Sequence, residues 1–424
     1  MQILAIAFVV SVMFVPPSLF LRPDFLLAGV AVAASAASSQ KRMAFGLVRL
    51  EALAIVVLWL LAVMTLIGQA LTTRNFIAQD AMILLRYGFY LCALLFGAVT
   101  GSMTRQPLKA FRVTILAGVA VVVTVSIAQY FYPGGMLGAV TLDIYGRPDY
   151  LGMIRVATRR ITGTMENPNY WGFYASALLL VSVVYLAFAK RRLWGIAAGL
   201  LLWVVILTGS RTAVLAPLIA WIGLIVIMVA VGHERISRSV VVTCTLLVLV
   251  AAVLYLVMAQ GGYEYAGRFA IENTRTLDYR LQHWGRIWNE IEGDLARLLI
   301  GSGPRKAEGP LWVDNMYLRL LSNYGVMAAG AYMALVWTGI RRLVSLLHGA
   351  SHQVRLHLAI AVLVWLLMAT FDLVADTWFN VRIASLVLFL HGFMVAVGIR
   401  DRTARGPLRE TKDFARTYAK NARW

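Results

Sequence analysis

The chain has few charged residues and almost no cysteine. Of its 424 residues only 14% are charged and 60% are hydrophobic, whereas a soluble domain has about a quarter of its residues charged. The two cysteines, Cys92 and Cys244, lie in separate apolar stretches without metal-ligand or redox spacing. These features exclude a soluble globular domain, a disordered chain and a disulfide scaffold.

The hydrophobic residues occur in long blocks. Each block has about 20 residues, enough to cross about 30 Å of hydrocarbon as a helix. The sequence therefore predicts an all-α polytopic membrane protein with about 12 transmembrane helices. The predicted spans are 2–20, 24–38, 51–70, 80–101, 111–131, 169–189, 193–209, 212–232, 238–259, 324–340, 355–371 and 382–399.

Positive charge dominates, with 39 Lys and Arg against 20 Asp and Glu. Most of it falls in the short loops after every second span and in the last 25 residues, as expected of cytoplasmic segments. We predict one transmembrane domain over 1–399 and a basic cytoplasmic tail over 400–424, with both termini in the cytoplasm. The tail is expected to lie on anionic membrane lipids, and no nucleic-acid partner is needed to explain the charge.

Two loops on the opposite, predicted periplasmic side depart from this charge pattern. They span roughly 132–168 and 260–323, and the second is expected to contain amphipathic helices. Arginine there favours an anionic ligand at the outer membrane face, because its planar fork fits phosphate oxygens, although solvated loop charge is the alternative. These loops carry Arg147, Arg155, Arg159, Arg160, Arg268, Arg275, Arg280, Arg286, Arg297, Arg305, Lys306 and Arg319.

The segment Thr208-Gly209-Ser210-Arg211 separates two spans at the same face. Arg211 is predicted in the first turn of the following helix, where the helix dipole disfavours a cation but favours a bound anion. Arg211 is therefore a candidate phosphate ligand. An interfacial arginine that reaches toward the headgroups is the alternative.

A second segment, Glu166-Asn167-Pro168-Asn169, opens the next span from the outside. Asn as an N-cap, followed by Pro in the first turn, is sufficient to start a helix. Glu166 and Asn169 are nevertheless kept as candidates for the acceptor site or the catalytic base.

The segment from Asp278 to Gly303 is predicted as one amphipathic helix that ends at its glycines. Arg280 and His283 share a face near its start, so His283 is a candidate base, although a lone histidine is more often structural. Its apolar positions are Leu281, Trp284, Trp288, Ile291, Leu295 and Leu298.

The remaining candidates lie close to span ends. Asp314, followed by Asn315, is predicted either to cap the next helix or to act in catalysis. Arg86, inside a span near its outer end, is the best addition to the anion site. Asp372 and Asp376 are candidates for pairing with loop arginines. No metal-ligand set or nucleotide fingerprint is found, so neither a metal nor a cofactor is expected.

Five motifs occur in order over roughly 160–340: NPNYWGFYA, LTGSRTAVLA, YRLQHWGRIW, LIGSGP and DNMYLRLLSNYGV. Together they resemble the O-antigen ligase/polymerase superfamily. Its members transfer glycans from undecaprenyl diphosphate at the outer face of the bacterial inner membrane, without metal or nucleotide. The resemblance implies that Arg211 and Arg280 bind the diphosphate. Where the ligases carry a His-Asn pair this chain has Asp314-Asn315, which is more similar to the polymerases.

The resulting hypothesis is an inner-membrane glycosyltransferase that polymerises repeat units of O-antigen or exopolysaccharide. Its partners would be an undecaprenyl-diphosphate-linked donor, a glycan or lipid acceptor and possible chain-length regulators. Asp314 would be the base, with Glu166, His283, Asn315 and Asn169 in reserve, and Arg86, Arg159 and Arg160 would assist Arg211 and Arg280. The alternatives are an O-antigen ligase that acts on lipid A core and, more distantly, a polysaccharide flippase.

Overall fold

The computed structural model describes residues 46–73, 78–132, 160–165, 167–189, 192–230, 275–303 and 315–405, together with Phe8. Within these ranges the chain is helical and contains no strand. In chain order the elements are α4 (Arg49–Thr73), α5 (Ala78–Met103), α6 (Pro107–Phe131), α9 (Pro168–Ala189), α10 (Arg192–Leu207), α11 (Arg211–Ala230), α14 (Arg275–Glu292), α15 (Leu295–Ile300), α16 (Met316–Leu347), α17 (His352–Phe371), the 3-10 turn η4 (Thr377–Phe379) and α18 (Val381–Arg405).

Seven of the described helices are long and apolar enough to cross a membrane: α4, α5, α6, α9, α16, α17 and α18. Helices α10 and α11 are apolar but shorter. These helices indicate a membrane protein, and nine of the predicted spans coincide with them. The predicted spans 2–20, 24–38 and 238–259 lie outside the described residues, so the total of twelve stays a prediction.

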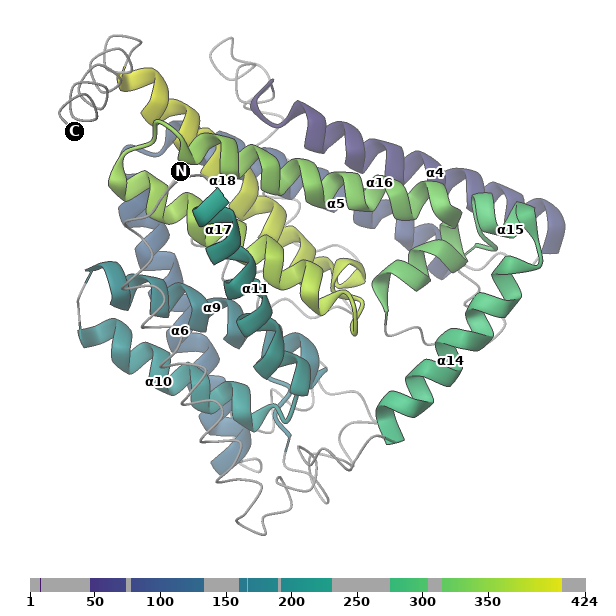
Figure 1. Cartoon of the computed structure of the whole chain (residues 1–424), viewed down its shortest axis with the longest axis horizontal. Helices are drawn as coiled ribbons and strands as arrows, with labels where there is room; N and C mark the ends of the chain where they lie inside the picture. The colour runs from purple at the N-terminus through teal and green to yellow at the C-terminus, as the bar shows by residue number, and fades with distance from the viewer. Residues whose placement is uncertain are drawn as a thin grey trace, which may run out of the picture.

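The helices pack in two groups joined by α17 and α18 (Figure 1). Helix α18 packs on α5, and α16 packs on α4, whereas α9 packs on α6 and α10, and α11 on α17. Helices α14 and α15 contact α16, and α14 projects away from the rest at the lower right of Figure 1. The core is therefore built where α17 and α18 cross between the groups.

The ends of the helices gather at two levels. We call one the Phe379 end: α6, α10 and α17 finish there, and α9, α11, α16 and α18 begin. We call the other the Arg400 end: α6 and α17 begin there, and the guanidinium of Arg400 donates to the carbonyl of Thr104 just after α5. The described loops that the charge pattern assigns to one side of the membrane thus lie together at one of these two ends. Which end faces the cytoplasm stays a prediction.

Helices α5 and α18 make the most extensive contact between described helices. Gly97 and Gly392 permit it, because a Cβ on Gly97 would overlap the carbonyl of Phe389 and one on Gly392 would overlap that of Leu94. Gly101, one turn beyond Gly97, meets the Phe393 carbonyl in the same way. Small residues four apart allow this close approach of helix backbones in membranes.

Helix α16 is longer than predicted and is interrupted. It begins at Met316 rather than at 324, and Gly325 inside it has a φ of 76° that breaks the regular helix. A Cβ on Gly325 would also meet the Leu299 backbone at the end of α15. The first nine residues of α16 therefore form a separate short segment. The predicted loop 260–323 extends too far, because its residues from Met316 onward belong to α16. Helix α18 likewise continues to Arg405, into the predicted tail.

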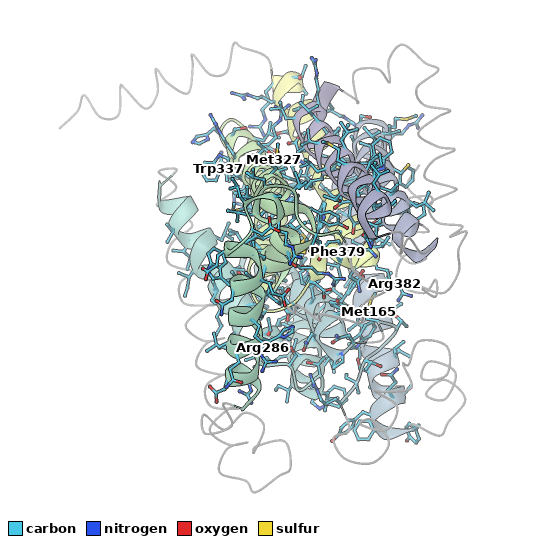
Figure 2. The ribbon with its side chains drawn as sticks, turned by 90° about the vertical axis from the view of Figure 1, so that its right-hand side faces the viewer. Met165, Arg286, Met327, Trp337, Phe379 and Arg382 are labelled. Atoms are coloured by element: carbon cyan, nitrogen blue, oxygen red, sulfur yellow. The ribbon has the colours of Figure 1, made fainter. Side chains whose placement is uncertain are left out.

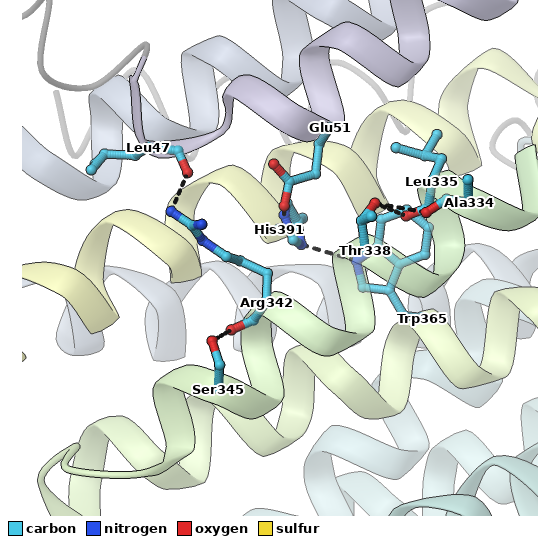
Figure 3. A network of polar contacts seen from close by, with 9 residues as sticks. All are labelled: Leu47, Glu51, Ala334, Leu335, Thr338, Arg342, Ser345, Trp365 and His391. Atoms are coloured by element: carbon cyan, nitrogen blue, oxygen red, sulfur yellow. Dashed lines mark hydrogen bonds and ion pairs between the residues drawn. The ribbon is translucent and has the colours of Figure 1, made fainter. Parts of the chain in front are cut away.

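A buried polar network fixes α4 against α16, α17 and α18 near the Arg400 end (Figure 3). The indole N–H of Trp365 donates to Nδ1 of His391 over 3.2 Å. Because that nitrogen accepts, Nε2 carries the ring proton and donates to the Glu51 carboxylate, also at 3.2 Å. Beside it, Arg342 donates to the Leu47 carbonyl and so holds the beginning of α4.

Candidate functional site

Two guanidinium groups share one aromatic ring at the Phe379 end. The Arg319 Cζ lies 4.4 Å from the Phe379 ring centroid, and the Arg86 Cζ lies 5.2 Å from it. Tyr324 also stacks on this ring. The Arg86 Nε is buried and has no hydrogen-bond partner among the described residues. A buried donor without a partner needs an explanation, and a ligand that accepts hydrogen bonds is one.

Asp376 is the carboxylate that balances part of this charge. It pairs with Arg319, and the hydroxyl of Tyr170, in the first turn of α9, donates to its other oxygen. The prediction that Asp376 pairs with a loop arginine is therefore confirmed, with Arg319 placed in the first turns of α16. This contact fixes the Arg319 side chain over Phe379.

Asp372, by contrast, is completely buried and holds the backbone of η4. Its carboxyl accepts from the hydroxyls of Tyr332 and Thr377 and from the Trp378 N–H, so it does not pair with an arginine. Burial raises the pKa of this carboxyl to about 7, although the hydrogen bonds it accepts oppose the shift. The hydroxyl of Tyr90, on α5, donates to the Trp378 carbonyl. Through its bonds to Thr377 and Trp378, Asp372 fixes the backbone of η4 and so positions Phe379.

Asn315 joins the predicted Asp-Asn motif to the same turn. Its Oδ1 accepts from the backbone N–H groups of Tyr317 and Leu318, and its Nδ2 donates to the Leu373 carbonyl over 2.9 Å. Asn315 is therefore the cap of α16, and the prediction that Asp314 caps this helix is wrong. Asp314 itself lies outside the described residues.

Two further arginines, Arg160 and Arg211, lie at the turn that begins α11. Arg211 is the first residue of α11, as predicted, and the Ser210 hydroxyl caps the helix by accepting from Ala213. The Arg160 Nε donates to the Thr208 carbonyl over 2.7 Å, and its side chain lies against Gly209. The structure thus brings Arg160 to the turn that carries Arg211. Arg159 lies outside the described residues.

Arg382, three residues after Phe379, contacts the segment 160–165 that carries Arg160. Its guanidinium donates to the Thr164 carbonyl and contacts the sulfur of Met165. Figure 2 shows Arg382 beside Met165, with Phe379 above them. The side chain of Gln129, at the end of α6, holds the same segment by bonding both the N–H and the carbonyl of Gly163. The Phe379 end therefore gathers arginines from five separate segments: Arg86, Arg160, Arg211, Arg319 and Arg382.

The motif that opens α9 has the structural role expected of it. The Asn167 Oδ1 accepts from the Asn169 N–H over 2.8 Å, and Pro168 is the first helical residue. The next residue, Tyr170, is the one that reaches Asp376. Glu166 lies outside the described residues.

Arg280 and His283 lie in the first half of α14. The prediction of one helix over 278–303 is wrong, because helix α14 ends at Glu292 and Asp294 caps a new helix, α15. Ile287 and Ile291 pack with Leu298 and with Leu318 and Leu321 of α16, whereas Leu281, Trp288 and Leu295 are exposed. In Figure 2, Arg286 of the same helix lies below Phe379, which is buried. The convergence of Arg211 and Arg280 on one diphosphate stays a prediction.

Three contributors to the site are absent from the predicted candidates: Tyr170, Phe379 and Arg382. The sequence predicts Arg319 only as one of the loop arginines, because the predicted span begins at 324 whereas α16 begins at Met316. The cap Asn315 is the signal that would have placed it correctly. The roles of the two aromatic residues depend on contacts between distant segments, which no local pattern shows.

The fold and the site together define a helical membrane protein with an arginine-rich, aromatic-lined end. Within the described ranges, no group of three His, Cys, Asp or Glu side chains is arranged to hold a metal ion. No family model matches the chain, and no curated protein matches it significantly. A functional assignment therefore depends on the chemistry of the Phe379 end and on the sequence motifs.

Proposed function

We propose that this protein is a glycosyltransferase of the bacterial inner membrane that acts on glycans carried by undecaprenyl diphosphate and polymerises their repeat units. The observation that carries the proposal is the placement of Arg86 and Arg319 on one ring, with the Arg86 Nε unpartnered among the described residues. The proposal takes this end as the periplasmic face. The motif order of the sequence supports the same function.

The electrostatics of the site favour a phosphate ligand. The Cζ atoms of Arg86 and Arg319 both lie within 5.2 Å of the Phe379 ring centroid, so the two like charges are no more than about 10 Å apart and repel by at least about 1.7 kcal/mol at an effective dielectric constant of about 20. Asp376 offsets the charge of Arg319, but Arg86 has no carboxylate partner among the described residues. A diphosphate that contacts both guanidinium groups would offset their repulsion and accept hydrogen bonds from them, as phosphate does in strong charge-assisted pairs with arginine.

The reaction that we propose is a displacement at the anomeric carbon. An acceptor hydroxyl oxygen bonds to that carbon while the bond to the diphosphate oxygen breaks, and the lipid diphosphate leaves with the electron pair. Negative charge grows on the leaving phosphates, so arginines already held in position stabilise the transition state more than the bound substrate. In this proposal Arg86 and Arg319 take this role, and Arg211 lies near them.

The hydroxyl proton needs an acceptor. Asp376 is already engaged by Arg319 and Tyr170, so we assign it to positioning Arg319. Asp314 remains the proposed base, because its neighbour Asn315 is bonded to the turn that carries Asp372 and Asp376. A buried carboxylate there would be a stronger base than an exposed one.

The first test is deletion of the gene in its host, followed by separation of lipid-linked glycans and surface polysaccharide on one gel. Single repeat units with no long chains would support the polymerase. Long chains stranded on the lipid carrier would identify a ligase, and an unchanged pattern would contradict the proposal.

A second test uses purified protein in detergent with a lipid-linked repeat unit, without ATP or an ion gradient. Chain growth under these conditions supports a transferase, because a flippase forms no glycosidic bond. Arg86→Gln should abolish growth, whereas Arg341→Gln, an exposed arginine at the Arg400 end, should not. Equal growth by both variants would refute the role of Arg86.

A further inference from the structure

A basic cavity lies at the Arg400 end, away from the proposed active site. Its volume is about 490 Å³, which is in the range of small-ligand sites. Lys109 and Arg112 of α6 and Arg400 of α18 contribute three cations to its lining, against the single carboxylate of Asp401 among the described residues. Asp401 already accepts from the Ser351 N–H over 2.7 Å and pairs with Arg405. The cavity is therefore suited to an anion.

The beginning of α6 adds to this preference. Pro107 is the first helical residue, and the preceding Gln106 provides no side-chain cap. The first backbone N–H groups of a helix lack intrahelical acceptors, and the dipole there attracts negative charge. Lys109 in this first turn is unfavourable for the isolated helix, whereas a bound phosphate would make it favourable.

A separate apolar groove lies farther along the same two helices, where α9 and α17 also line it. Described residues that line it include Phe111, Ile115 and Gly118 of α6 and Leu386, Leu390 and Phe393 of α18. On α18 the groove and the cavity occupy one face, because Leu386, Leu390, Phe393, Val397 and Arg400 follow at three- and four-residue steps.

The length of this combined site fits one leaflet of a bilayer. Fourteen residues separate Leu386 from Arg400, and at about 1.5 Å per residue they span about 21 Å. Half of a bilayer, headgroups included, measures about 20–22 Å. A molecule with an anionic head at Arg400 could therefore extend a hydrocarbon chain along the whole groove.

We propose that the α6–α18 site binds an anionic glycerophospholipid, with its phosphate in the basic cavity and an acyl chain in the groove. A zwitterionic lipid would bring its own ammonium group toward Lys109, Arg112 and Arg400, so the site discriminates against it. This inference does not depend on the proposed transferase activity, because the two sites lie at opposite ends of the bundle.

The test is lipid titration of delipidated protein in detergent, read out by native mass spectrometry and by the thermal unfolding midpoint. Phosphatidylglycerol should bind and raise the midpoint, whereas phosphatidylcholine with the same acyl chains should do so weakly. Lys109→Gln combined with Arg112→Gln should weaken phosphatidylglycerol binding about thirty-fold, which is about 2 kcal/mol at 1.4 kcal/mol per factor of ten. Both residues are exposed, so the double variant should fold.

Three controls separate the two halves of the proposal. Arg341→Gln, at the same end but outside the cavity, should bind like the unaltered protein. Thr114→Phe, which fills the groove without a change of charge, should also weaken lipid binding. Glycerol 3-phosphate should give little stabilisation. Equal binding of the two lipids, an unaffected double variant, or full stabilisation by glycerol 3-phosphate would overturn the proposal.

Discussion

Replacement of Gly97 by alanine tests the close packing of α5 on α18. The new Cβ would overlap the Phe389 carbonyl, and a backbone atom cannot rotate away as a side chain can. The two helices would have to separate, and overpacking of this kind typically costs about 1–3 kcal/mol. Even a gap of about 0.5–1 Å loses a quarter to a half of the dispersion energy of each contact along the interface.

Gly88 provides a matched control on the same helix. It is exposed, and nothing lies within 4 Å of a Cβ placed there, so Gly88→Ala should be neutral or stabilise by up to about 1 kcal/mol through helix propensity. We expect the two variants to differ in free energy of unfolding by about 1–4 kcal/mol. Gly392→Ala, which meets Leu94 from the other side of the interface, should behave like Gly97→Ala.

The assay is unfolding of the purified protein in mixed micelles with increasing SDS, followed by circular dichroism. Gly97→Ala should unfold at a lower SDS fraction than Gly88→Ala. Identical midpoints for the two variants would show that α5 and α18 are not in close contact at Gly97, and the interface described above would be incorrect.

Three further predictions concern the Phe379 end. Because the pKa of Asp372 is raised to about 7, the folded protein holds its proton more tightly than the unfolded chain, and the unfolding free energy should fall by up to about 4 kcal/mol as the pH rises from about 4 to 7. Asp372→Asn should flatten this profile in SDS unfolding between pH 5 and 8, and parallel profiles would contradict the assignment. Gly325→Ala should lower the free energy of unfolding by about 1–3 kcal/mol, because φ is 76° there. Gly330→Ala, with open space around its Cβ, should not lower it. Equal unfolding midpoints for the two variants would argue against the break in α16. Arg86→Lys keeps the charge but loses the fork, so chain growth in detergent should slow by about 10²–10³-fold, and near-normal growth would exclude two-point binding of phosphate by Arg86.

The sequence predicts helix positions well where a specific residue marks the boundary. Asn167 with Pro168 marks the start of α9, and Ser210 marks that of α11. The break in α16 is not predictable, because glycine is tolerated inside helices and only the structure reveals the positive φ of Gly325. The start of α15 had a local signal in Gly293-Asp294, which is a typical helix end followed by a cap.

The site is less predictable than the helices. Arg86 and Asp376 are conspicuous because charge inside or beside an apolar span is unusual. The contacts that they make cannot be predicted from the sequence, because Arg319 and Asp376 are 57 residues apart and Tyr170 is 206 residues from Asp376. Sequence patterns identify which residues carry chemistry, whereas the packing of α9, α16 and α18 decides which of them meet.

Synthesis from the N-terminus inserts α5 well before α18 has been made, since 288 residues separate Tyr90 from its acceptor Trp378. During that interval α18 does not yet cover the glycine face of α5, and Arg86 lacks the ring of Phe379. Among the described elements, η4 and α18 are made last, so they complete the arginine site and the most extensive helix contact. A nascent chain arrested before α18 would present an uncovered small-residue stripe and a membrane-embedded cation, the features by which quality-control proteases could distinguish it from the finished protein.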